Sequence, residues 1–145
     1  MPVEPAGGEY TGGVMELSQQ QGAQVSALLQ QYVSSVDGVR SAVLASVDGF
    51  SLAEVAGNDR SGQRLAAMTS AMLALAGAVG RELELGELKV LMLEALDGKV
   101  LMLSLNAGQT SVLLMAACDQ RSVIGNVLWS ARECGEKLLE TLARA

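Results

Sequence analysis

Apolar residues recur every three or four positions from about Gln20 to Ser35, with glutamines and serines between them. This spacing predicts an amphipathic helix with one buried stripe, ended by Asp37-Gly38. The period then shortens, and apolar runs at about Val39–Val47 and Phe50–Ala56 predict two strands. Asp48-Gly49 lies between the runs. Such a pair favours a tight hairpin turn because both central turn residues need positive φ.

The stretch Ser61–Leu83 predicts a helix that is apolar on most of its sides. It carries one stripe of large side chains and one stripe of alanines: Leu65, Met68, Met72, Leu75 and Val79, then Ala67, Ala71, Ala74 and Ala78. A helix this apolar is normally covered on more than one side. We expect the sheet to cover one side and a second copy of the chain to cover another. Burial within a monomer is the alternative.

Three further strands are expected at about Leu88–Leu96, Lys99–Leu105 and Thr110–Cys118. Asp97-Gly98 joins the first pair and Asn106-Ala107-Gly108 joins the second. These connections are too short for parallel crossovers, so the strands should be antiparallel. Both faces of the strands are mostly apolar, which indicates a sheet covered on both faces.

The last helix is expected from about Gln120 to Ala143, with Asp119 as its N-cap. Trp129 lies off its apolar stripe, so it is either a hot spot for a partner or a contact with the first helix. The full order is α-β-β-α-β-β-β-α. It predicts an α+β fold with a central five-stranded antiparallel sheet sandwiched by helices.

The composition excludes several classes of function. The 145-residue chain, expected to form one domain, has no histidine, which removes Ser-His-Asp and Cys-His catalytic sites and His-ligated metal sites. Its two cysteines are too few for an all-thiolate zinc or iron–sulfur site. The net charge of −6 is spread without a basic patch, which argues against nucleic acid and anionic membranes. We therefore expect no metal site, and acid–base catalysis is hard to assign to this sequence.

The first 16 residues hold both prolines and several glycines, and they lack the basic and apolar regions of a signal peptide. They predict a flexible tail before a domain spanning residues 17–145. No apolar run reaches the ~18 residues of a membrane span. Cys118 and Cys134 lie in apolar or helical contexts, so a reduced, cytoplasmic protein is expected.

Other residues with possible chemistry have a structural interpretation. Asp48 and Asp97 each precede a glycine and are interpreted as turn residues rather than acids or metal ligands. No phosphate-binding loop motif occurs, so a nucleotide would belong to another chain. Most methionines are expected to fill the core, and those on the middle helix are the exceptions. The methionines considered are Met68, Met72, Met92, Met102 and Met115.

Four stretches resemble the Roadblock family of dynein light-chain relatives, which has a profilin-like fold. They read "GVRSAVLASVDGFSLAE", "RLAAMTSAMLALAGAVG", "LKVLMLEALDGKVLMLSL" and "TSVLLMAACDQRSVIGNV". The first two are the most specific, because they place Ser-x-Asp-Gly at a hairpin turn before an alanine-rich helix that opens "LAA". The resemblance covers about residues 20 to 143. The family includes bacterial partners of small Ras-like GTPases.

The resemblance implies a homodimer that pairs through the middle helix and the neighbouring edge strand. The expected interface residues are Ala67, Met68, Ala71, Met72, Ala74, Leu75, Ala78, Leu91 and Leu93. It also implies a module that is not an enzyme, has no cofactor or small-molecule substrate, and binds and regulates a small Ras-like GTPase. The partner-binding candidates are Arg60, Gln63, Arg64, Arg81 and Trp129, and the alternative for each arginine is a solvated surface position. The second hypothesis for the whole chain is a structural adaptor that does not affect nucleotide turnover.

Overall fold

The computed structural model describes residues 9–11, 14–55 and 62–144. From Gln19 onward, the predicted order of helices and strands is confirmed. The elements are α1 (Gln19–Ser35), β3 (Val39–Ser46), β4 (Ser51–Val55), α2 (Gly62–Glu82), β5 (Val90–Ala95), β6 (Gly98–Ala107), β7 (Thr110–Asp119) and α3 (Ile124–Ala143). The start of α1 is a capping box, in which the Ser18 hydroxyl accepts from the backbone N–H of Gln21 and the Gln21 side chain accepts from that of Ser18.

Two short strands precede α1 and were not predicted. β1 (Glu9–Thr11) and β2 (Val14–Glu16) pair antiparallel within the segment expected to be a flexible tail. Met15 is buried in the core, and Leu17 packs against that core. The division at residue 17 stays a prediction, with Met15 already contributing to the domain.

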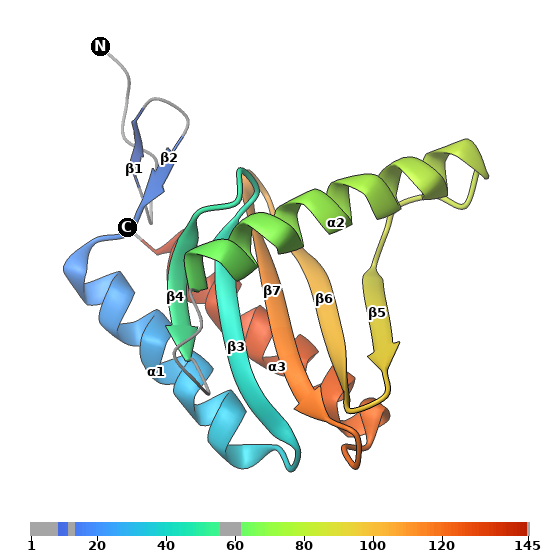
Figure 1. The fold of residues 1–145 in the computed structure, drawn as a ribbon. Coiled ribbons are helices and arrows are strands. Elements are labelled where there is room, and N and C mark those ends of the chain that lie inside the picture. Colours follow the sequence, from blue (N-terminus) through green and yellow to red (C-terminus); the bar gives the residue numbers. More distant parts are fainter. Residues whose placement is uncertain (1–8, 12–13, 56–61, 145) are drawn as a thin grey trace.

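The central sheet has the strand order β4-β3-β7-β6-β5, and every neighbouring pair is antiparallel. Helices α1 and α3 cover one face, and α2 crosses the other face diagonally (Figure 1). β4 and β5 are therefore the two edges of the sheet. The prediction that both faces are covered is confirmed by two separate apolar clusters, one on each side.

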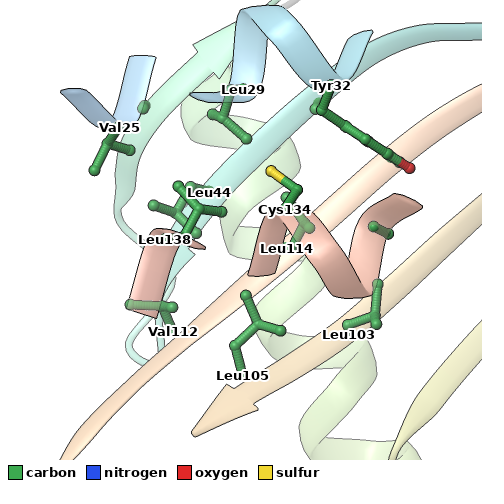
Figure 2. Packing of buried hydrophobic residues seen from close by; sticks show 14 of the residues in the cluster. Val25, Leu29, Tyr32, Leu44, Leu103, Leu105, Val112, Leu114, Cys134 and Leu138 are labelled. Atoms are coloured by element: carbon green, nitrogen blue, oxygen red, sulfur yellow. The ribbon is translucent and has the colours of Figure 1, made fainter. Parts of the chain in front are cut away.

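The larger cluster lies between the sheet and the helix pair α1/α3. Figure 2 shows Leu29 and Tyr32 of α1 beside Cys134 and Leu138 of α3, above the strand residue Leu114. Alternate residues of β6 and β7 point into it, as the period of two requires. The Tyr32 hydroxyl donates a 3.1 Å hydrogen bond to the carbonyl oxygen of Val127, so this buried polar atom is paired.

The turns differ from their prediction in detail. In the β3–β4 hairpin only Gly49 has positive φ, at +91°; Asp48 does not. The Ser46 N–H donates to the Phe50 carbonyl oxygen, which closes a three-residue loop in which one left-handed residue suffices. In the next hairpin Gly98 belongs to β6, opposite Ala95, rather than to the turn. Leu96 and Asp97 form that loop.

Asp119 is not the N-cap of the last helix. β7 extends to Asp119, and α3 begins at Ile124 with Val123 at the N-cap position and no side-chain cap. The Asp119 carboxylate instead accepts from the Arg121 N–H at 3.0 Å and pairs with the Arg40 guanidinium at 2.9 Å. A short loop therefore separates β7 from α3, whereas the sequence predicted that the helix begins directly after the strand.

Candidate interaction face

The buried side of helix α2 consists of small residues and one leucine. Gly62, Ala66, Thr69 and Leu73 are buried, and they recur at intervals of three or four positions along one side of the helix. The small residues allow a close approach to the strands. Much of the remaining surface of α2 is exposed in the described part of this chain.

Both apolar stripes predicted for α2 are accessible in the single chain. In the large stripe, the exposed fractions are 51% for Met68, 69% for Leu75 and 52% for Val79. Leu65 and Met72 are half-buried. All four alanines of the other stripe, Ala67, Ala71, Ala74 and Ala78, are exposed. Leu75 and Val79 are more than half exposed. The described residues of this chain therefore do not bury the second apolar side of α2, for which the sequence predicted a partner.

The edge strand β5 continues the accessible apolar surface. Leu91 is half-buried and Leu93 is 39% exposed. Their register partners on β6 are Met102 and Val100, which belong to the cluster under α2, so both leucines point to the α2 face. Met92 points to the opposite face and is 53% exposed, so the expectation that it fills the core is wrong. Met102 and Met115 are buried, as expected.

A groove of about 400 Å³ opens between α2 and the sheet. Its lining is mostly apolar: Leu65, Met68 and Met72 from α2, with Val100, Met102, Met115 and Ala117 from the strands. Arg40 and Ser41 lie at its β3 side. Thr69 also lines the groove, and its buried hydroxyl oxygen has no hydrogen-bond partner in the described part of the chain. We refer to this feature as the methionine groove.

The partner-binding candidates fall into three groups. Arg60 lies outside the described residues. Gln63 holds the β3–β4 hairpin, because its side-chain amide donates to the Gly49 carbonyl oxygen at 2.9 Å and accepts from the Ser51 N–H at 3.0 Å. Arg64 and Arg81 are exposed at opposite ends of α2. Gln63 therefore has a structural role in linking α2 to the hairpin. The sequence carries no signal of this role, which depends on the geometry of the hairpin.

Trp129 is not buried between α3 and α1. Its side chain is 69% exposed on α3, so the alternative that it fills the contact between the two helices is wrong. The helix contact is instead made by residues such as Cys134, whose thiol lies 3.8 Å from the Leu28 carbonyl oxygen. Trp129 remains a large apolar side chain facing solvent, on the same helix as exposed Arg132 and Glu133.

The ionisable side chains of the described residues are relevant to metal binding and to thiol reactivity. Among residues 9–11, 14–55 and 62–144, no group of three His, Cys, Asp or Glu side chains could hold a metal ion. Burial raises the pKa of the Cys134 thiol to about 11 and also raises the pKa of the Cys118 thiol. Both thiols are therefore protonated near neutral pH and weakly reactive. None of the described helices is long and apolar enough to cross a membrane.

Comparisons with known proteins agree with this architecture. A family model described as the Roadblock/LC7 domain matches residues 25–117. The gliding protein MglB from Thermus thermophilus superposes with a TM-score of 0.76 at 18% identity, covering 99% of this chain and 100% of that one. A structure described as MglB with tetrameric arrangement gives 0.75 at 19% identity, covering 97% of each chain.

A Roadblock/LC7 domain from Streptomyces avermitilis superposes with a TM-score of 0.72 at 19% identity, covering 81% of this chain and 96% of that one. At these identities the solved structures establish a shared fold. Among curated proteins, none matches the chain in sequence.

Proposed function

This chain belongs to the Roadblock/LC7 domain family, and from that premise we propose that it is a homodimeric binding module that regulates a small Ras-like GTPase in the cytoplasm. The observation that carries the proposal is the uncovered apolar surface running from α2 to the edge strand β5. Leu75 is 69% exposed on the helix and Leu93 is 39% exposed on the strand. Apolar surface of this extent is characteristic of a protein–protein interface.

Self-association has two independent supports. The edge strand β5 presents unpaired backbone groups to solvent, and pairing with a second copy would satisfy them. In addition, one structural neighbour is described as MglB with tetrameric arrangement. A second copy of this chain could cover the helix and the strand edge at the same time.

The GTPase is proposed because of family membership and the lack of catalytic motifs in the sequence itself. The sequence has no phosphate-binding loop and no histidine, so binding another protein is a more economical role than hydrolysing a nucleotide. Arg64 and Arg81 are exposed on α2, where a docked GTPase would meet them. Basic side chains can stabilise the charge that develops during phosphoryl transfer.

The proposal is tested by measuring GTP hydrolysis by a Ras-like GTPase of the same organism, with and without this protein. We expect a changed rate and a complex that co-elutes on a sizing column. Arg81→Ala should weaken the effect, whereas Arg121→Ala, which alters an exposed arginine on the loop after β7, should not. An unchanged rate together with separate elution would reject the GTPase as a partner.

A structural adaptor is the second candidate, and the exposure of Trp129 favours it. A tryptophan with 69% of its surface in water is a candidate anchor for a partner on the α3 side of the molecule. Partner capture can be compared between Trp129→Ala and Arg81→Ala. Loss with the tryptophan variant alone, with no change in GTP hydrolysis, would favour the adaptor; loss with the arginine variant alone would favour the GTPase regulator.

A further inference from the structure

The outer side of α3 carries exposed apolar residues. The buried residues Val127 and Ala131 define the side of the helix that faces the sheet. Trp129 lies two positions after Val127, which places it about 200° further around the helix and therefore on the opposite side. Trp129 and Val123, the residue at the N-cap position, are both more than half exposed. Because α2 and α3 cover opposite faces of the sheet, this outer side is separate from the surface that α2 presents (Figure 1).

A glycine lies one helical turn before the tryptophan. Gly125 and Trp129 are four residues apart, so they are neighbours on the same side of α3. A Cβ at Gly125 would meet nothing within 4 Å, so the described part of the chain contains no close contact that requires glycine there. Glycine also weakens a helix relative to alanine. The outer side of α3 therefore combines a large exposed ring with an adjacent gap that the fold itself does not use.

The ring and the gap are complementary when two α3 helices lie antiparallel. If a two-fold axis passes beside position 127, position 129 of each helix faces position 125 of the other. The ring of Trp129 in one copy then lies over Gly125 of the other, where the missing Cβ allows the indole to reach the backbone. The contact occurs twice by symmetry, so both tryptophans are removed from water.

The same axis brings opposite charges together. Positions 121 and 133 are equally far from position 127, so Arg121 of one copy lies beside Glu133 of the other. Both side chains are exposed, and neither forms an ion pair with another described residue. Arg121 lies in the loop just before α3, from which its long side chain can reach across. An apolar centre with a charged rim is the usual anatomy of a protein–protein contact.

We propose that a second copy of the chain docks on the outer side of α3, with the two helices antiparallel and Trp129 of each copy packed on Gly125 of the other. The ion pairs between Arg121 and Glu133 fix the register of the two helices. A single pair of helices buries less surface than a standard interface, so this contact is weaker than pairing through α2 and β5 and forms at higher protein concentration.

The α3 contact has a consequence for the assembly as a whole. Antiparallel pairing of two β5 strands extends one sheet, and both α3 helices of such a dimer lie on the same face of it. Two dimers can therefore meet face to face through two α3 contacts, which closes a group of four chains. This consequence rests on the proposed self-association, whereas the α3 contact itself does not.

Substitutions on the outer side of α3 test the contact by sedimentation equilibrium. The wild-type mass should rise toward four times the 15.0 kDa of one chain at high concentration. Trp129→Ala should raise the dissociation constant of this step about ten-fold or more, as for an interface hot spot. Glu140→Ala, at an exposed position near the other end of α3, is the control and should change it less than about three-fold.

Gly125→Ala separates the contact from damage to the fold. The added methyl group should raise the melting temperature of the chain, because alanine favours a helix, and it should weaken the α3 contact, because it fills the gap. Loss of folding cannot produce this pair of results. A Gly125→Ala variant that associates as strongly as the wild type would overturn the proposed packing.

A charge exchange tests the register. Arg121→Glu and Glu133→Arg should each weaken the contact, and the double variant should recover most of the wild-type affinity because the pair is restored with its signs reversed. A double variant weaker than both single variants would overturn the antiparallel arrangement.

Leu75→Glu, on the exposed side of α2, distinguishes this inference from the proposed function. A two-chain species that persists in Leu75→Glu and is lost on adding Trp129→Ala would support the α3 contact even without pairing through α2. A Trp129→Ala protein with the wild-type mass at every concentration would overturn the α3 contact and leave pairing through α2 standing. Capture of a different protein that depends on Trp129, with that same unchanged mass, would assign the tryptophan to the adaptor function instead.

Discussion

The side-chain amide of Gln63 donates a 2.9 Å hydrogen bond to the carbonyl oxygen of Gly49, fourteen residues earlier in the chain. Its own oxygen accepts a 3.0 Å bond from the Ser51 N–H. One side chain in the first turn of α2 therefore spans the tip of the β3–β4 hairpin. Through this contact the helix that carries the proposed interface is held in place on the sheet.

Gln63→Ala should destabilise the protein by about 1–2 kcal/mol, because it removes both hydrogen bonds and leaves the Gly49 carbonyl oxygen without its side-chain donor. The measurement is urea unfolding followed by circular dichroism. Gln24→Ala, at an exposed position of α1, is the control and should change the free energy of unfolding by less than about 0.5 kcal/mol. Equal stabilities of the two variants would show that the Gln63 bridge is unimportant.

Two glycine-to-alanine substitutions should have opposite effects. A Cβ at Gly98 would lie 2.6 Å from the carbonyl oxygen of Cys118 on the neighbouring strand, and the backbone would have to move. Gly98→Ala should therefore cost about 1–3 kcal/mol. At Gly125 in α3 a Cβ meets nothing within 4 Å, so Gly125→Ala should stabilise by about 0.5–1 kcal/mol. Thermal melting of both variants checks the signs, and a stabilising Gly98→Ala would contradict the hairpin register.

Cys134 should make the fold sensitive to alkaline pH. Burial raises the pKa of its thiol from 9.0 to about 11, so the folded state holds the proton more tightly than the unfolded state. The resulting stabilisation is fully present below pH 9 and is lost as the pH rises toward 11. Two pKa units correspond to about 2–3 kcal/mol.

The comparison variant for this prediction is Cys134→Ala. Cys118, whose pKa is also raised by burial, is present in both proteins. Tyr32 is present in both as well, but Cys134 contributes to its raised pKa, so the difference between the two proteins contains that contribution too. Urea unfolding across this pH range should therefore show a steeper alkaline loss for the wild type than for the variant. Parallel curves would mean that Cys134 is less buried than the structure shows.

From α1 onward the order of elements was predictable because each one has a local signal in the sequence. The stripe of α1 and the Asp-Gly pairs identify helices and hairpins from neighbouring residues alone. The apolar excess of α2 likewise indicated a second side in need of cover, and the exposure of Leu75 agrees with this. Trp129 was correctly placed off the stripe of α3, although its surroundings were not predicted.

Features that depend on distant residues were not predictable in the same way. Asp119 looks like a helix cap, but Arg40, 79 residues earlier, pairs with its carboxylate at the end of β7. The methionine groove needs the register of three strands to bring Ser41, Ala117 and Val100 into one row. Which side of α2 borders the tip of the β3–β4 hairpin depends on the tertiary structure, and no local pattern specifies it.

The mass of the wild-type protein in solution, measured by sedimentation equilibrium over a wide range of concentrations, tests the central claim most directly. The exposed stripe of α2 and the free edge of β5 predict a species of twice the 15.0 kDa of one chain. A mass that stays at 15.0 kDa at the highest concentration would contradict the account, because Leu75 and Val79 would then face water with no partner.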